Sequence, residues 1–435
     1  MNKIPCVLAI LKLFIFLFFN SDVFAVVHSE NVDTAELVGY NSAIALDSKD
    51  RPHISYNSKY PVYELKYASY NGKKWHISVI DSNVGEGTSI AIDNKDYPHI
   101  SYFSSYPDYA LKYTFFDGSK WNSTTVDTLG DLGSYISLAL DKNGWPHISY
   151  FDYSNVDLKY AYYDGLTWHK EKVDFLGDVG QYNALALDAD GLPHISYFDY
   201  TNGDLKYASN DGTRWFITTV DTLGMVGKYT SLALDKKGNP HISYFDNTNI
   251  NLKYAYYDDI SWHTTIVDSK HNTGLYTSLK LDVNDYPHIS YFSFSQQACK
   301  YAFYYGNTFI IQDVDSVGKY GGNTSIAIDS ISKVHISYAS YKDYDLKYAT
   351  DRGIVSGLVT DVATGQPIPR AKVFMVQDGM ETLRAKADAM GHYQFLIPYK
   401  GAFSLKAKCR GYESERVKVI YYGEQIIQNF ALNKQ

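Results

Sequence analysis

The segment Pro52-His53-Ile54-Ser55-Tyr56 decides the fold, because copies of it recur through most of the chain. Five copies keep all five residues and a sixth changes only the first; they begin at Pro98, Pro146, Pro193, Pro240, Pro287 and Val334. Successive copies lie 46 to 48 residues apart. A period of this length indicates a repeat architecture, in which each copy marks one supersecondary unit.

Each repeat carries two further signatures. A Leu-Lys-Tyr motif follows the first segment, with Cys replacing Leu once; it begins at Leu65, Leu111, Leu158, Leu205, Leu252, Cys299 and Leu346. A large aromatic residue comes next, at Trp75, Trp121, Trp168, Trp215, Trp262 and Phe309. The three signatures keep their order and spacing, so they belong to one unit repeated seven times.

Four short strands account for one repeat. In the fifth repeat we expect them at residues 230–235, 240–245, 252–257 and 262–268, where β-branched and aromatic residues alternate with turns rich in Gly, Asn and Asp. No helical apolar period accompanies them, which disfavours a helical solenoid. Four strands in about 40 to 50 residues are typical of a propeller blade. We therefore predict an all-β chain whose main body, residues 26–353, is a seven-bladed β-propeller.

The ends of the repeat array predict how the propeller closes. Fourth strands end in Asp at Asp81, Asp127, Asp174, Asp221, Asp268 and Asp315, and the seventh repeat runs out before any fourth strand. Residues 27–33 align with residues 168–174, a fourth strand three repeats away. We therefore expect residues 26–33 to pair beside the third strand of the last blade, which removes open sheet edges.

Residues 1–25 have the features of a signal peptide. Lys3 and Lys12 precede or flank a short apolar run, and Val23-Phe24-Ala25 forms a small-residue cleavage site. The alternative is a retained N-terminal anchor, although the run is short for a bilayer. We expect a secreted, periplasmic or cell-surface monomer with no transmembrane segment after cleavage.

Residues 354–435 have a different pattern, with alternating apolar residues and Gly-rich turns. Gly357-Leu358-Val359-Thr360-Asp361 is followed by Thr364-Gly365-Gln366-Pro367-Ile368 and by Gly391-His392-Tyr393-Gln394-Phe395. This pattern predicts a small β-sandwich. It resembles the carboxypeptidase regulatory-like domains, which have a transthyretin-like fold. The resemblance implies a non-catalytic, accessory or carbohydrate-binding role.

Charge and cysteine content exclude several classes. The net charge is −8, negative over residues 26–353 and positive over residues 354–435. An acidic body argues against nucleic-acid binding, which needs a basic surface. Cys299 and Cys409 lie in different domains, so a disulfide between them is not expected and packing must stabilise the fold.

The repeated His, Asp, Ser and Lys residues are interpreted as architecture. A ring of seven His on the second strands is too wide for one metal ion, whose ligands must lie near ~2 Å. We expect each His (as at His53) to join the Asp that ends the first strand and the Ser two residues later in a buried network, similar in kind to that of WD repeats. The repeated Lys is expected to pair with a repeated Asp, the alternative being a ring that binds an anion. No cofactor is expected; residues 188–191 hint weakly at calcium, against a plain hairpin turn.

Residues 209–215, Ser-Asn-Asp-Gly-Thr-Arg-Trp, resemble the Asp-box of sialidase-type propellers but are one residue shorter. In that family the box braces a hairpin and takes no part in catalysis. Sialidases also need a cluster of three arginines, whereas residues 26–353 hold only Arg51, Arg214 and Arg352, which fall in turns or at the domain junction. We therefore assign no catalytic residue.

The loops that differ between repeats are the candidate binding surface. Function in a repeat fold usually lies where repeats differ, and the loops between second and third strands carry Tyr60, Tyr63, Tyr106, Tyr109, Tyr153, Tyr200, Phe294, Tyr341 and Tyr344. These aromatics suit sugar stacking or peptide contact, or they cap the blades. The leading hypothesis is a secreted, non-catalytic recognition protein for a glycan or an extracellular protein. The alternative is a polysaccharide lyase or glycoside hydrolase with its site in the central pocket, using loop Tyr, His271 or acidic residues; an asymmetric cluster of His, Tyr, Glu or Arg there would favour it.

Overall fold

A computed structural model describes residues 27–35, 37–59, 62–82, 84–128, 135–270, 272–305, 307–315, 322–340, 343–351, 353–377, 380–397, 401–421 and 426–435. The secondary structure of these residues is entirely β. The predicted signal peptide, Glu36, Tyr60, His271, Tyr341 and Arg352 lie outside the described residues. Within the described ranges, no helix has the length and apolar character needed to cross a membrane.

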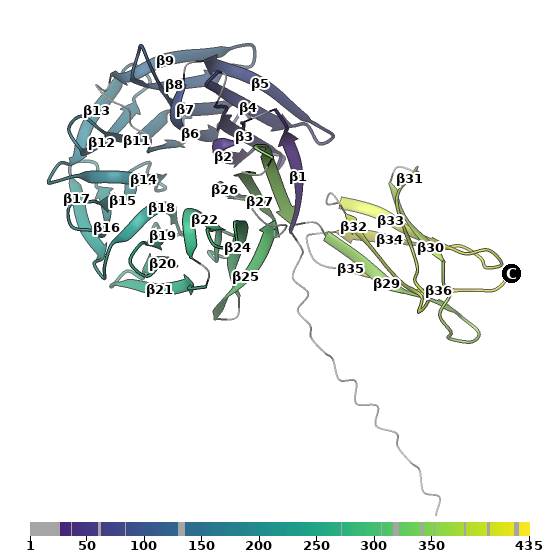
Figure 1. The fold of residues 1–435 in the computed structure, drawn as a ribbon. Coiled ribbons are helices and arrows are strands. Elements are labelled where there is room, and N and C mark those ends of the chain that lie inside the picture. The colour runs from purple at the N-terminus through teal and green to yellow at the C-terminus, as the bar shows by residue number, and fades with distance from the viewer. Residues whose placement is uncertain are drawn as a thin grey trace, which may run out of the picture.

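Seven four-stranded antiparallel sheets form a propeller, as predicted (Figure 1). Blades 1 to 6 consist of β2–β5, β6–β9, β10–β13, β14–β17, β18–β21 and β22–β25, and blade 7 consists of β26, β27, β28 and β1. The innermost strands are β2 (Tyr40–Leu46), β6 (Val84–Ile92), β10 (Ile136–Leu140), β14 (Val179–Leu187), β18 (Val226–Leu234), β22 (Thr273–Leu281) and β26 (Gly322–Ile328). The second strands are β3 (Pro52–Asn57), β7 (Pro98–Ser104), β11 (Pro146–Asp152), β15 (Pro193–Asp199), β19 (Pro240–Asp246), β23 (Pro287–Ser293) and β27 (Val334–Ala339).

The third and fourth strands lie progressively further from the axis. The third strands are β4 (Glu64–Tyr70), β8 (Ala110–Phe116), β12 (Asp157–Tyr163), β16 (Asp204–Asn210), β20 (Asn251–Tyr257), β24 (Ala298–Tyr305) and β28 (Leu346–Asp351). The fourth strands are β5 (Trp75–Ser82), β9 (Trp121–Thr128), β13 (Trp168–Asp174), β17 (Trp215–Asp221), β21 (Trp262–Asp268), β25 (Thr308–Asp315) and β1 (Val27–Asp33).

The N-terminal strand closes the ring, and the predicted pairing is confirmed. β1 pairs antiparallel with β28, with Val27 opposite Asp351 and Asn31 opposite Lys347. The side chains of Val27 and Val32 are buried in two different inter-blade clusters. At the axis, β2 lies beside both β6 and β26, so the innermost strands contact one another all the way round.

The Asp that ends each fourth strand joins its blade to the next. A Tyr hydroxyl from the following second strand donates to this Asp in all seven blades; for example, Tyr197 Oη lies 2.7 Å from Asp174 Oδ2. In five blades the repeated Lys of the following blade also pairs with it, as Lys206 does at 2.8 Å. Lys112 and Lys300 pair instead with Asp108 and Asp313. The predicted Lys–Asp pairing is therefore confirmed and these ammonium groups are neutralised within the fold.

The repeated His has an Asp neighbour, as predicted, but its hydroxyl partner is Tyr. In six blades His Nε2 lies 3.4 to 3.9 Å from the Asp that follows the innermost strand. In all seven blades His Nδ1 is hydrogen-bonded to the Tyr hydroxyl of the Leu-Lys-Tyr motif, as in His194 and Tyr207. The Asp also braces the hairpin turn: Asp188 Oδ1 accepts the backbone N–H groups of Asp190 and Leu192.

The prediction that Ser joins the His network is wrong. The Ser side chain lies on the same face of the strand as His, two residues further along, where it reaches the innermost strand of the next blade. Ser196 Oγ lies 2.8 Å from Thr230 Oγ1, and Ser337 of blade 7 lies 3.1 Å from Ser42 of blade 1. These hydroxyl contacts connect neighbouring blades next to the axis.

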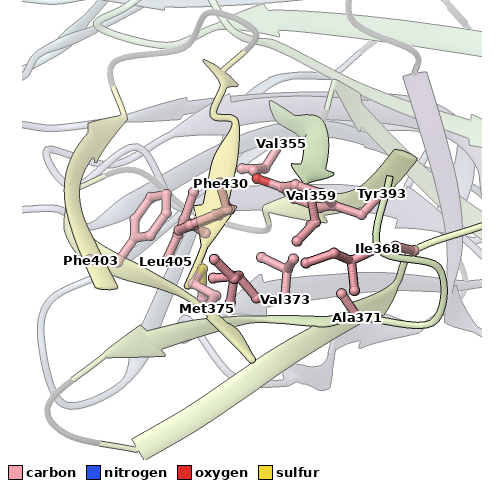
Figure 2. Packing of buried hydrophobic residues seen from close by; sticks show 13 residues of the cluster. Val355, Val359, Ile368, Ala371, Val373, Met375, Tyr393, Phe403, Leu405 and Phe430 are labelled. Atoms are coloured by element: carbon pink, nitrogen blue, oxygen red, sulfur yellow. The ribbon is translucent and has the colours of Figure 1, made fainter. Parts of the chain in front are cut away.

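The strands after residue 352 form two further sheets, which make the predicted sandwich. One contains β29 (Gly353–Asp361), β32 (His392–Ile397), β35 (Ile426–Ile427) and β36 (Phe430–Leu432); the other contains β30 (Lys372–Gln377), β31 (Met380–Lys386), β33 (Gly401–Lys408) and β34 (Glu415–Tyr421). Val355, Val359, Met375 and Phe430 pack between them (Figure 2). Gly357 permits two backbone segments to approach closely, because a Cβ there would lie 1.9 Å from the Gln428 carbonyl oxygen. Cys299 and Cys409 are both free thiols, with Cys299 in the propeller core.

Candidate functional site

A pocket of about 190 Å³ opens on the propeller axis. Each blade contributes two adjacent residues from the first half of its innermost strand or directly before it. They are Asn41, Ser42, Gly87, Thr88, Tyr135, Ile136, Tyr182, Asn183, Tyr229, Thr230, Tyr276, Thr277, Asn323 and Thr324. Innermost strands begin at the face that carries the connections between second and third strands, since the sheets are antiparallel. The pocket therefore opens on the same face as the candidate loop aromatics.

Four tyrosines form an arc on one side of this pocket. Tyr135, Tyr182, Tyr229 and Tyr276 occupy the same place in blades 3 to 6, and Asn41, Gly87 and Asn323 occupy it in the other three. Successive ring centroids in the arc lie 4.3, 4.5 and 4.7 Å apart. The propeller repeat is therefore broken at its axis, with a continuous aromatic wall facing small polar side chains.

The backbone at this place is left-handed. The φ angles are 55° at Tyr182, 54° at Tyr229 and 52° at Tyr276, close to the 50° of Asn41. Asn and Gly adopt this conformation readily, whereas a bulky residue there costs about 1–2 kcal/mol. Irregular register between β14 and β15 at this point shows a bulge, which turns the side chain toward the axis. Strain of this kind is typical of functional sites.

The pocket is polar but uncharged. No Asp, Glu, His, Lys or Arg is among the residues that line it in the described part of the chain. Burial raises the pKa of Tyr135, Tyr182 and Tyr229 above the ordinary value. Neighbouring phenols raise the pKa further at Tyr182 and Tyr229. These phenols therefore stay protonated near neutral pH and act as hydrogen-bond donors and stacking surfaces, not as bases.

Two of the loop aromatics connect to this arc. Tyr153 contacts buried Phe151 at 5.3 Å between ring centroids, and Phe151 contacts Tyr135 at 6.2 Å. Tyr200 reaches Tyr182 in the same way through Phe198, at 6.1 and 6.3 Å. Tyr153 and Tyr200 are both about half exposed, whereas Phe151 and Phe198 are buried, so packed rings connect the loops of blades 3 and 4 to the axis beneath the surface.

The other loop candidates are distributed over further blades. Tyr106 and Tyr109 pair edge to face at 6.1 Å, and Tyr106 is 73% exposed. Tyr63, Phe294 and Tyr344 are exposed on blades 1, 6 and 7. Tyr60 and Tyr341 lie outside the described residues. The described members of the predicted set thus form an open surface, within which Tyr153 and Tyr200 connect to the axial arc.

The arc itself was not predicted, although the sequence contains a signal for it. A Gly-x-Tyr triplet recurs at Gly133, Gly180, Gly227 and Gly274, immediately before the expected first strands. At Gly180, φ is 105° and a Cβ would lie 2.7 Å from Leu158 Cα. The Gly is therefore required by packing between blades, and the Tyr two residues later lies at the axis.

Comparisons with known proteins identify the C-terminal segment and the propeller architecture. Residues 354–433 match the family model of the carboxypeptidase regulatory-like domain. An ulvan lyase has a TM-score of 0.51 and 13% identity over 74% of this chain and 95% of its own. A second polysaccharide lyase has a TM-score of 0.50 and 12% identity over 75% and 99%. The protein AofleA from Arthrobotrys oligospora has a TM-score of 0.49 and 12% identity over 68% and 91%.

At these identities the likeness to solved structures shows the fold alone. No curated protein matches the chain in sequence. The chain combines a seven-bladed β-propeller with a C-terminal segment that matches the carboxypeptidase regulatory-like domain.

Proposed function

We propose that this chain is a secreted, non-catalytic carbohydrate-recognition protein whose main site is the axial tyrosine arc. The observation that carries the proposal is the arc itself: Tyr182, Tyr229 and Tyr276 keep a strained backbone conformation that Asn adopts at lower cost in blades 1 and 7. A strained residue that the fold does not require is explained by binding.

The chemistry of the pocket suits a sugar chain. Aromatic faces stack on the C–H faces of sugar rings, and a few polar groups placed around them fix orientation. The arc supplies the faces, while Asn41 and Asn323 supply amide donors and acceptors. Protonated phenols add further donors.

The exposed loop tyrosines extend the proposed surface outward. Tyr153 and Tyr200 continue the aromatic path from the axis over blades 3 and 4. A saccharide entering the axial pocket would extend over this face toward the exposed rings of Tyr153 and Tyr200, with Tyr106 on blade 2 and Phe294 on blade 6. The C-terminal domain serves as an accessory module in this proposal.

The polysaccharide-active alternative is less well supported. The axial cluster is asymmetric and contains Tyr, which partly meets the expectation for an enzyme. Lyases and glycosidases, however, need a base, an acid or a carboxylate pair at the scissile bond. Among the described residues lining the pocket there is neither a carboxylate nor a cation, and the raised pKa of the phenols opposes a tyrosinate base.

A glycan array combined with a turnover screen tests the proposal. The mature protein is expected to retain a subset of glycans and to release no product from any polysaccharide. Tyr182→Asn and Tyr229→Asn, which introduce the residue of blades 1 and 7, should weaken binding roughly tenfold or more. Product release would establish the enzymatic alternative, and unchanged binding in both variants would place the site elsewhere.

A further inference from the structure

A second concavity lies between blades 5 and 6, at the opposite face of the propeller. Its volume is about 490 Å³, which is within the range of small-ligand sites. Its rim includes the turn after β22, with Asp285 and Tyr286, and the turn before β25, with Asn307 and Thr308. Both turns lie at the ends of strands opposite to the axial arc, so the two sites are separate.

The sixth blade departs from the repeat where this cleft opens. Phe309 stands where five other blades have Trp. Its ring contacts Tyr254 of blade 5 and Tyr304 of its own blade, with centroids 5.6 and 5.2 Å away. The neighbouring Trp262 makes the corresponding contacts, with Tyr207 and Tyr257. Phe309 thus keeps the aromatic contacts with a smaller ring than the indole. An equivalent cleft lies between blades 7 and 1, where Trp75 is present, so the cleft is a feature of the blade boundary and Phe309 changes only its wall.

The residue that faces Phe309 from the preceding blade is not a Glu. Where the preceding blade carries Glu, the indole N–H donates to it: Trp215 to Glu171 at 2.9 Å and Trp75 to Glu30 at 3.0 Å. The corresponding residue opposite Phe309 is Thr265, which lines the cleft and is exposed. Phe309 offers it no N–H, so the Thr265 hydroxyl is available to a ligand.

The remaining lining is aromatic and electrically balanced. Tyr256, Tyr286 and Tyr304 provide ring surface, and Tyr286 is half exposed. Asp285 is the carboxylate on the rim, and Lys236 Nζ lies 3.9 Å from its Oδ2. Burial lowers the pKa of His241, which is therefore neutral near pH 7. A site with aromatic walls, hydroxyl and amide groups and little net charge fits an uncharged sugar ring better than a uronate or a sulfated sugar.

We propose that the cleft between blades 5 and 6 is a second saccharide site, which takes an uncharged pyranose and has Phe309 in its wall. The ring would stack on the exposed tyrosine surface, with Thr265, Asn307 and Asp285 available to its hydroxyls. Because it opens on the face opposite the arc, this site gives the propeller two faces able to engage sugars, and it does not require the axial site to function.

The substitution Phe309→Trp tests the site without threatening the fold, since Trp occupies this place in five blades. Saturation-transfer NMR on the full-length mature chain would use methyl glucoside, methyl galactoside, methyl mannoside, methyl fucoside and N-acetylglucosamine, with glucuronate as the anionic probe. The wild-type chain is expected to bind at least one uncharged sugar. Phe309→Trp should weaken that binding roughly tenfold, because the larger indole projects into the part of the cleft where the sugar would lie.

Two control variants separate this proposal from the axial one. Tyr182→Asn alters the arc and should leave the Phe309-dependent signal unchanged. Trp262→Phe makes the reverse exchange of rings at the equivalent position of the preceding blade, and it should also leave that signal unchanged. Equal binding of every uncharged sugar by Phe309→Trp and wild type would overturn the cleft site, and so would binding of glucuronate alone or of none of the probes. Loss of signal only in Tyr182→Asn would overturn the cleft site while supporting the axial one.

Discussion

The boundary between blades and the axis of the propeller follow different rules in the same repeat. At the boundary, a Tyr hydroxyl donates to a fourth-strand Asp in all seven blades, including the Asp33 that arrives from the N-terminus. At the axis, the repeat position that lines the pocket at each innermost strand is Tyr in four blades and Asn or Gly in three. The boundary must be the same everywhere for the ring to close, whereas the axis is free to vary. Uniformity therefore marks architecture, and its loss marks recognition.

Removing the closing strand should have the largest effect. Deleting residues up to Asp33 takes Val27 and Val32 out of two clusters and leaves Tyr56 and Lys66 without Asp33. Burial of two Val side chains alone is worth about 3–6 kcal/mol, so we expect a loss of at least that size in urea denaturation. A synthetic peptide of residues 26–33 should restore part of it. Unchanged stability in the truncated chain would contradict closure through β1.

Acid should destabilise the uniform part of the molecule next. Burial lowers the pKa of six repeated histidines, including His194 and His241, below the ordinary value of 6.5. As pH falls below about 6.5 the unfolded chain takes up these protons before the folded chain does, so stability falls. Their effects add because the six sites lie in different blades and act independently.

A second loss should begin below about pH 4. Lys neighbours and hydrogen bonds hold the pKa of Asp33, Asp174 and Asp221 below 3.8 in spite of burial, so their contribution is present above that value and disappears on protonation. Urea midpoints measured between neutral and acid pH should show both stages. His194→Gln should reduce the slope of the first stage, and a flat profile from pH 7 to 4 would contradict the assignment.

A matched pair of Tyr substitutions in blade 4 tests the comparison directly. Tyr197→Phe removes the donor to buried Asp174 and should cost about 1–3 kcal/mol with little change in glycan binding. Tyr182→Asn should change stability by less than about 1 kcal/mol, because lost ring contacts are offset by relief of backbone strain, and it should reduce binding. Chemical denaturation and the glycan array measure the two effects. If Tyr197→Phe reduced glycan binding and Tyr182→Asn reduced stability instead, the distinction between boundary and axis would be wrong.

Periodicity explains why the fold was predictable and the arc was not. Six copies of Pro-His-Ile-Ser-Tyr and a seventh that begins with Val establish blade number and strand order, and the fourth-strand pattern of residues 27–33 identifies the closing strand. The partner of each repeated side chain was harder to predict. Ser196 and His194 lie two residues apart, yet one faces Thr230 of the next blade and the other Tyr207 of its own. Both side chains lie on the same face of β15, so alternation along the strand does not tell which one reaches the next blade; that depends on how the blades pack, and the bulge at Tyr182 changes the register near the axis.

Blade 2 contains a small break in the uniform boundary that predicts a stabilising substitution. Ser101 Oγ is buried without a partner, whereas the corresponding Ser196 contacts Thr230 at 2.8 Å. The residue facing Ser101 in blade 3 is Ile136, where other blades have Thr, Asn or Ser. Ile136→Thr should supply the missing hydroxyl and raise the free energy of unfolding by about 0.5–1 kcal/mol, since a buried unpaired group costs more than the lost apolar contact. The same substitution in a Ser101→Ala background should be neutral or destabilising. Stabilisation in both backgrounds would show that the removal of Ile136, and not a new hydrogen bond between Ser101 and the introduced threonine hydroxyl, raises the free energy of unfolding.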